Sequence, residues 1–384
     1  MADRTVVVLG AGTGGLVVAH RLRRLLDKGD RVVLVDREST YWYAPSFLWV
    51  MTGARQPERI TADLRRVRRR GIELLTAEVL DVDPERRRVK TSHADLSYDR
   101  LVVCPGAELA PELLPGFAEA ARNVYTLPGA TAAGDELRRL DAGRVAVVVS
   151  RLPYKCPAAP YEAAFLAEAL LRRCGAGERT SVDVYTPEPY PMPTAGPILG
   201  EALAGMLAAR GIGFHPGSTT EQIDPERREL VLTGRGRVGY DLLLGVPPHR
   251  APRFVAEGAL AGASGFVPVD PATLQTGTDG IYAVGDVAAV PIADGKFLPK
   301  AGVFAHAEAE VVARRIADEL AGREPSATFD GTGGCFVELG DGRAAYAAGR
   351  FFGDGGPQIT LRRPGRHWHA AKVAFEQYWM RRWF

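Results

Sequence analysis

The stretch Thr5-Val6-Val7-Val8-Leu9-Gly10-Ala11-Gly12-Thr13-Gly14-Gly15 decides the fold of this chain. Its first five residues form a continuous apolar run, which is typical of a strand buried on both faces of a parallel sheet. After the glycines come a helical pattern over 16–26 and a second apolar strand over 31–35 that ends at Asp36. A strand, a glycine loop, a helix and a strand in this order predict a doubly wound α/β unit.

The same loop carries the residue types that bind a dinucleotide. Gly10 permits the tight turn after the strand, Gly12 lets the backbone approach a pyrophosphate, and Gly15 lets the helix pack closely on the strand. Gly14 belongs to the same loop, and we include it among the predicted cofactor-binding residues. Asp36 follows about 20 residues later, where a carboxylate can hydrogen-bond a ribose hydroxyl, as in FAD or NAD.

Two later segments distinguish between these cofactors. The run 97–106 ends in Cys104-Pro105-Gly106. It resembles the segment that closes the FAD domain in flavoproteins with two dinucleotide domains, although those proteins usually have Ala-Thr-Gly there. The run 280–286 ends in Gly285-Asp286 and resembles the motif whose aspartate binds the ribityl chain or pyrophosphate of FAD. These resemblances imply that the cofactor is FAD and that Gly106, Gly285 and Asp286 contact it.

A second unit repeats the plan without the glycine loop. Strands are predicted over 145–149 and 182–185, with a helix over 163–173 between them. Where a nicotinamide nucleotide would need Gly-x-Gly-x-x-Gly, the chain reads Tyr154-Lys155-Cys156-Pro157-Ala158-Ala159-Pro160-Tyr161-Glu162. A phosphate cradle needs backbone N–H groups, and proline removes them. We therefore expect no NAD(P)H binding here, and a thiol takes the place of the loop.

Composition excludes several classes of protein. The chain has 384 residues, 46% of them hydrophobic and 24% charged, as in an ordinary globular protein of about two or three domains. A net charge of +2 is too small to indicate nucleic-acid binding. The four cysteines have no metal-ligand spacing. Because there is neither a leader pattern nor an apolar run of about 18 residues, we expect a cytoplasmic protein.

The C-terminal segment predicts a helix with an aromatic face. Its aromatic residues share one face at helical spacing, and cations lie nearby: Trp368, Phe375, Trp379 and Trp383, with Lys372, Arg381 and Arg382. Such a pattern is typical of an interfacial helix with tryptophans at the depth of the lipid headgroups. The alternative is a helix packed on the core or on a partner chain. The interfacial interpretation predicts a peripheral protein on the inner face of the membrane.

Taken together, these segments make the chain resemble the sulfide:quinone oxidoreductases and the flavoprotein subunit of flavocytochrome c sulfide dehydrogenase. The likeness extends over the whole length and is carried by these segments: the first glycine loop, Pro45-Ser46 with Trp49, 155–162, Gly285-Asp286, 299–302, Gly334-Cys335-Phe336 with Gly340-Asp341, and 369–378.

We therefore predict an α/β flavoprotein with two interleaved Rossmann-like domains of the glutathione-reductase type. The FAD-binding domain comprises 1–110 and 251–325. A second dinucleotide-type domain that has lost its NAD loop covers 111–250. The last part, 326–384, carries a redox cysteine and the amphipathic helix.

The resemblance also implies a set of catalytic residues. In that family, two cysteines matching Cys156 and Cys335 flank the flavin and handle sulfur. Hydrosulfide attacks the bridged pair, one sulfur becomes a persulfide, and the electrons pass by way of FAD to a quinone. Lys300 matches a family lysine near the flavin. Glu162 is a candidate general base.

Each of these residues also has an ordinary interpretation. The cysteines could be two buried thiols, Glu162 a solvated acid in the first turn of a helix, and Lys300 a surface lysine. For a reactive Cys156 we expect a thiol pKa lowered from about 8.5, because a helix begins after it and Lys155 adds positive charge. The aromatic segment 41–50 fits either the core or the wall of an apolar channel to the flavin.

Several functions and partners follow from this sequence. The main expectation is oxidation of sulfide or a small sulfur compound, with a quinone as electron acceptor and a homodimer as one possible assembly. The alternatives are an NADH:quinone oxidoreductase on the same fold, a non-catalytic flavoprotein subunit, and a soluble sulfur-transfer flavoenzyme with another acceptor.

Overall fold

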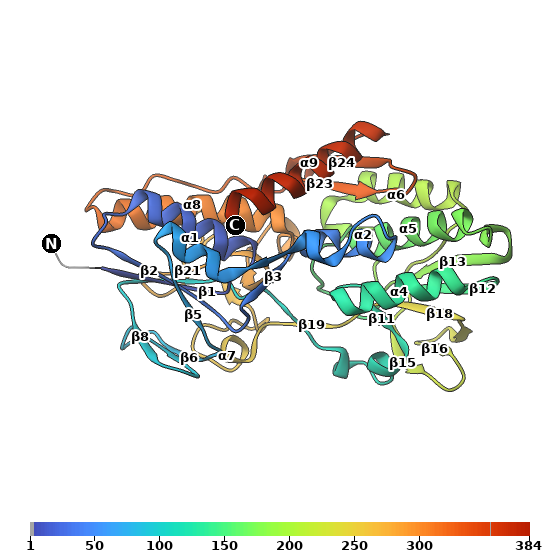
Figure 1. Cartoon of the computed structure of the whole chain (residues 1–384), viewed down its shortest axis with the longest axis horizontal. Coiled ribbons are helices and arrows are strands. Elements are labelled where there is room, and N and C mark those ends of the chain that lie inside the picture. Colours follow the sequence, from blue (N-terminus) through green and yellow to red (C-terminus); the bar gives the residue numbers. More distant parts are fainter. Residues whose placement is uncertain (1–3, 354) are drawn as a thin grey trace.

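The computed structural model describes residues 4–353 and 355–384, which form two lobes, each built on a sheet (Figure 1). The first lobe contains a five-stranded parallel sheet in the order β21-β9-β1-β2-β5. Its strands are Ile281–Ala283 (β21), Arg100–Val103 (β9), Thr5–Leu9 (β1), Arg31–Asp36 (β2) and Glu73–Thr76 (β5). The central strand is buried from Val6 to Leu9, and the predicted α/β fold class is confirmed.

Two helices cover one face of this sheet, α1 (Thr13–Leu25) and α8 (Gly302–Leu320) (Figure 1). Gly15 is what allows α1 to lie so close to the strand before it. A Cβ on this residue would stand 1.8 Å from the carbonyl oxygen of Gly10. Gly10 itself has a φ of 97°, in the region that only glycine adopts freely. Both roles agree with the sequence expectation.

The parallel order brings distant loops to one edge of the first sheet. The residues that follow β1, β2, β9 and β21 all emerge at the carboxyl ends of neighbouring strands. In open α/β sheets, ligands bind outside these carboxyl ends. We refer to this place as the cofactor edge.

The second lobe contains another five-stranded parallel sheet, in the order β11-β18-β12-β13-β14. Its strands are Arg122–Asn123 (β11), Leu242–Val246 (β18), Gly143–Val149 (β12), Thr180–Tyr185 (β13) and Gly213–His215 (β14). The accompanying helices are α4 (Leu127–Arg139), α5 (Ala159–Arg173) and α6 (Pro197–Ala209). Helix α5 begins four residues before the predicted start, since its first turn tolerates Pro160.

A third sheet and the last helix connect the lobes. The sheet comprises β23 (Thr332–Glu338), β24 (Ala344–Arg350) and β25 (Gln358–Gly365). Helix α9 (Arg366–Trp383) packs on this sheet at its start and runs to α1 at its end (Figure 1). Smaller elements complete the fold: α2 (Phe47–Met51), α3 (Phe117–Ala120), α7 (Arg253–Ala256), the hairpin sheets 79–97 and 220–239, and short strand pairs.

The position of α9 corrects one expectation. Trp379 and Trp383 are each only 2% exposed, so these two tryptophans do not face a lipid surface. The Trp379 indole donates a hydrogen bond of 2.8 Å to the hydroxyl of Tyr41, and Trp383 packs edge-on against His20. The reason is that segment 41–43 and α1 offer an apolar surface, and burying a large aromatic ring there is strongly favourable. In the part of the chain that the structure describes, no helix is long and apolar enough to cross a bilayer.

Candidate functional site

The cofactor edge has the features that a dinucleotide pyrophosphate requires. None of the described side chains caps the amino end of α1. The first N–H groups of this helix therefore face the cofactor edge without a side-chain acceptor and can bind an anion. A Cβ built on Gly12 or on Gly106 would meet no described atom within 4 Å. Gly14 is different, because its Cβ would lie 2.8 Å from the Val284 side chain, so this glycine serves packing. The loop therefore fits a bound dinucleotide.

Asp36 lies at the end of β2, beside this loop. Its carboxylate accepts hydrogen bonds from the N–H groups of Ala11 (2.6 Å) and Glu38 (2.9 Å). Burial raises the pKa of Asp36. This is where the sequence predicts a contact with the cofactor ribose.

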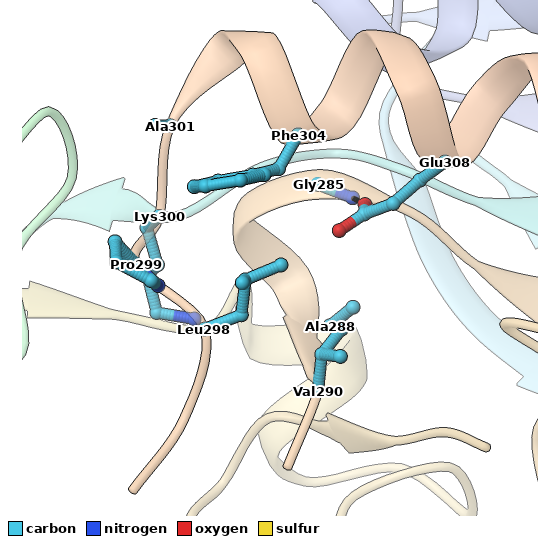
Figure 2. Close-up of a pocket in the computed structure, with 9 residues that line it drawn as sticks. All are labelled: Gly285, Ala288, Val290, Leu298, Pro299, Lys300, Ala301, Phe304 and Glu308. Atoms are coloured by element: carbon cyan, nitrogen blue, oxygen red, sulfur yellow. Dashed lines mark hydrogen bonds between the residues drawn. The ribbon is translucent and has the colours of Figure 1, made fainter. Parts of the chain in front are cut away.

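Lys300 lies in a small pocket that includes Gly285 (Figure 2). Its ammonium group donates to the carbonyl oxygen of Asp286 at 2.5 Å and lies 3.6 Å from the ring centroid of Phe266. Burial lowers the pKa of Lys300 to about 8. The alternative of an exposed surface lysine is therefore wrong.

Glu308 is a pocket residue that the sequence analysis missed. It reaches from α8 toward Gly285, whose N–H donates to its carboxylate at 2.7 Å (Figure 2). Burial, with the negative charge of Asp286 nearby, raises the pKa of Glu308 to about 7. Inside a helical pattern a single glutamate gives no signal, so only the fold reveals this buried acid.

The two predicted redox cysteines both lie in a buried environment, and each is affected by the charges of Glu162 and Lys372. Burial raises the pKa of the Cys156 thiol, and the negative charge of Cys335 raises it further. The two sulfur groups therefore lie within electrostatic range of each other. The backbone of Cys156 is held on both sides. Its N–H donates to the backbone carbonyl oxygen of Lys300 (2.6 Å), and its own carbonyl oxygen accepts from the Tyr125 hydroxyl (3.2 Å).

The expected direction of the Cys156 pKa is wrong. We expected the helix and Lys155 to lower it, but removal from water disfavours the thiolate more strongly. The same cause raises the pKa of Cys335 to about 12. The cation that opposes burial at both thiols is Lys372, from α9.

Glu162 is buried, at 4% exposure, and not a solvated acid. Its carboxylate accepts from the ammonium group of Lys372 at 2.7 Å and from the backbone N–H of Glu338 at 2.7 Å. A carboxylate that faces a thiol pair and is held by a cation can receive and return protons.

A polar cluster surrounds this ion pair. The sequence analysis expected Lys372 to be a cation of the interfacial helix, and this expectation is wrong, because its side chain is only 13% exposed and is paired with Glu162. It assigned no role to the other polar residues of the cluster. Glu338, on β23, accepts a hydrogen bond from His369 on α9. The indole of Trp49, on α2, lies 5.1 Å from the Lys372 ammonium. The available signal was the His-x-x-Lys spacing of 369–372, which places both side chains on one face of a helix.

The carboxyl edge of the second sheet is closed by side chains. Glu188, which follows β13, accepts hydrogen bonds from the hydroxyls of Tyr154 and Tyr161. All three are buried. These tyrosines come from the segment where a nucleotide loop would lie, so the edge holds a hydrogen-bonded cluster of its own.

The fold and the cofactor edge define an α/β flavoprotein with two dinucleotide-type units, of which one retains its glycine loop. The model of the pyridine nucleotide-disulphide oxidoreductase family matches residues 4–309, and the chain belongs to this family. It is a flavin-dependent oxidoreductase, and its cofactor is FAD, as predicted.

Individual relatives agree with the resemblance found in the sequence. The mitochondrial sulfide:quinone oxidoreductase of Mus musculus is 23% identical and covers 89% of this chain and 77% of its own length. The sulfide-quinone reductase of Aquifex aeolicus is 25% identical, over 98% of this chain and 90% of its own. The crystal structure of the Aquifex protein superposes with a TM-score of 0.89 at 22% identity, over 99% and 91% of the two chains, and shows the same fold. The predicted resemblance is confirmed.

Proposed function

We propose that this chain oxidises sulfide to sulfane sulfur through the Cys156/Cys335 pair, with the electrons leaving by way of FAD to a quinone. The observation that carries the proposal is that the two cysteines lie within electrostatic range of the buried Glu162–Lys372 ion pair, whose atoms are 2.7 Å apart, and that Cys335 also affects the pKa of Cys156. Both named relatives support the choice of sulfide and quinone.

The chain's own residues suit this chemistry. Hydrosulfide breaks the bond between the two sulfurs of the oxidised pair, which leaves a persulfide on one cysteine and a thiolate on the other. Lys372 favours the thiolate, since its charge opposes the effect of burial on both thiol pKa values. FAD, when bound, supplies a two-electron acceptor, held by the loop 10–15, Asp36 and Asp286. A small acceptor then takes the sulfane sulfur from the persulfide.

The test is an anaerobic titration of the purified flavoprotein with sulfide. Wild-type protein should lose its oxidised flavin absorbance, whereas the Cys156→Ser and Cys335→Ser variants should not. The double variant should be no worse than either single one, because residues that act as a unit are not additive. Cys174→Ser is the matched control, since this cysteine is exposed at the end of α5. Unchanged bleaching in both single variants would contradict the proposal.

We also propose that the outer face of α9 rests on a lipid surface, where a quinone is available. Phe375 is 44% and Tyr378 55% exposed there, and Arg381 is exposed beside them. Liposomes containing anionic lipid should carry the wild-type protein in a flotation gradient, and the Phe375→Ser/Tyr378→Ser variant should float markedly less. Equal flotation of the two proteins would exclude this face.

A further inference from the structure

The hydrogen-bonded cluster at the closed edge of the second sheet lies beside the segment that carries Cys156. We propose that Tyr154, held by the buried Glu188, positions this segment for the reaction of Cys156 with sulfide. The inference rests on the proposed function and adds a residue to it. Because Tyr154 acts through the backbone next to Cys156, it is a positioning residue.

Glu188 is fixed through both its backbone and its side chain. Its N–H donates to the Thr186 hydroxyl (3.2 Å), and its carbonyl oxygen accepts from the N–H of Gly217 (3.0 Å). One carboxylate oxygen, Oε2, accepts from the hydroxyls of Tyr154 (3.0 Å), Thr186 (3.1 Å) and Tyr161. Glu188 is only 2% exposed, so this carboxylate is a rigid acceptor inside the second lobe.

Tyr154 joins this acid to the Cys156 segment. Its ring packs in a buried cluster at the carboxyl ends of β12 and β18. Its hydroxyl lies 3.0 Å from the Glu188 carboxylate and 3.3 Å from the carbonyl oxygen of Pro157. A hydroxyl has one proton to donate, so the two acceptors share it. Burial raises the pKa of Tyr154 well above its ordinary value, so the hydroxyl keeps this proton.

The segment before α5 depends on bonds of this kind. Cys156 has a φ of 51°, and such a conformation persists only where its surroundings impose it. Its N–H donates to the carbonyl oxygen of Lys300, and its own carbonyl oxygen accepts from the Tyr125 hydroxyl. The Tyr154 hydroxyl adds a bond at the next residue, Pro157. Loss of this bond therefore lets the segment relax.

The same segment is tied to the cofactor edge. The carbonyl oxygen of Lys300 receives the Cys156 N–H, while the Lys300 ammonium donates to the carbonyl oxygen of Asp286. Sulfur exchange requires the incoming sulfur to be aligned with the bond that breaks, and a misplacement of about 1 Å can slow a reaction about 100-fold. A displaced segment should therefore slow the chemical step.

The test compares two substitutions that each remove one hydroxyl from Glu188. Tyr154→Phe keeps the buried ring but removes the bond to the Pro157 carbonyl. Tyr161→Phe is the matched control, because the Tyr161 hydroxyl donates to Glu188 and, among the described residues, makes no hydrogen bond to the segment 156–157. Holoenzyme is mixed anaerobically with increasing sulfide, and the rate of flavin bleaching gives a limiting rate and a half-saturating concentration.

Tyr154→Phe should lower the limiting rate about 10-fold. The half-saturating sulfide concentration should not change, because the substitution leaves every charge around the cysteines in place. Tyr161→Phe should bleach at the wild-type rate. Reduction by dithionite bypasses the cysteines and should be equally fast in all these proteins. Both variants should lose a similar amount of thermal stability, since each deprives the same buried carboxylate of one donor.

Substitutions of Glu188 test whether Tyr154 acts through this acid. Glu188→Ala should slow the limiting rate as Tyr154→Phe does. The double variant should be no slower than either single one, because two residues that act through one hydroxyl are not additive. Glu188→Gln retains an acceptor for the Tyr154 hydroxyl and should keep the wild-type rate.

Four outcomes would contradict these expectations. A wild-type limiting rate in Tyr154→Phe would overturn the positioning role while the proposed function stands. An equal loss in Tyr161→Phe would overturn it too, because the cluster would then act only through the stability of the lobe. Additive losses in the double variant would overturn the link through Glu188. Failure of sulfide to bleach the wild-type flavin would instead overturn the proposed function.

Discussion

Cys156 illustrates how a single residue is shaped by its surroundings. Its φ of 51° lies in the left-handed region that residues with a side chain seldom adopt. Such a conformation persists only where neighbours enforce it, and here the hydrogen bonds to Lys300 and Tyr125 do so. These two bonds fix the backbone of Cys156 on both sides.

At the same scale, Glu308 makes stability depend on pH. Its pKa is raised from 4.5 to about 7, so between these values the folded protein holds a proton that the unfolded chain releases. The free energy of unfolding must then fall as the pH rises through this window. Relative to Glu308→Gln, the wild-type protein should lose about 2 kcal/mol between pH 5 and pH 7.5. Urea unfolding at both pH values measures this, and parallel curves for the two proteins would contradict it.

Among the elements, α9 has the largest influence on the site. Its first half supplies His369 and Lys372 to the polar cluster, and its second half buries Trp379 and Trp383 against the first lobe. The helix therefore positions a cation beside the sulfur pair because its far end is anchored in the core.

A pair of substitutions on α9 tests this anchoring. Trp379→Ala should cost about 3–5 kcal/mol of unfolding free energy, as for other large aromatic residues removed from a core. The adjacent Tyr378, which is 55% exposed, should tolerate Ala within about 0.5 kcal/mol. Denaturant unfolding of both variants checks the difference. Equal costs would contradict the orientation of the helix.

For the whole molecule, the two lobes share one architecture but present different edges. The first sheet ends in a loop of glycines with open space before Gly12 and Gly106. The second ends in a buried cluster, in which the hydroxyls of Tyr154 and Tyr161 donate hydrogen bonds to the Glu188 carboxylate. The second lobe therefore serves as a scaffold for Cys156 and Glu162, both of which it carries.

This closed edge predicts that NADH is not a substrate. Under anaerobic conditions in which sulfide bleaches the flavin, NADH at the same concentration should leave the absorbance unchanged. No glycine loop is present to receive its pyrophosphate, and the place is filled by hydrogen-bonded side chains. Bleaching by NADH at a rate comparable to that with sulfide would favour the alternative of an NADH:quinone oxidoreductase.

Much of the fold could be predicted because its signals are local. The run 5–15 predicted a strand, a loop and a helix that the structure shows as β1 and α1, and family membership confirmed FAD. The roles of Cys156, Cys335, Glu162 and Lys300, and the domain limits, stay predictions. Glu338 and His369 received no roles from the sequence, and Lys372 was expected only as a cation of an interfacial helix, because the three form a site only together.

The sequence by itself determined the doubly wound architecture, the cofactor and the loss of the second glycine loop, because each depends on residues that are neighbours along the chain. Only the tertiary structure decided that burial raises the pKa of the Cys156 thiol and that Lys372 supplies the nearby cation. It also decided that two tryptophans face inward. The physical reason is the same in each case: desolvation and charge depend on which remote segments cover a residue, and no local pattern contains that information.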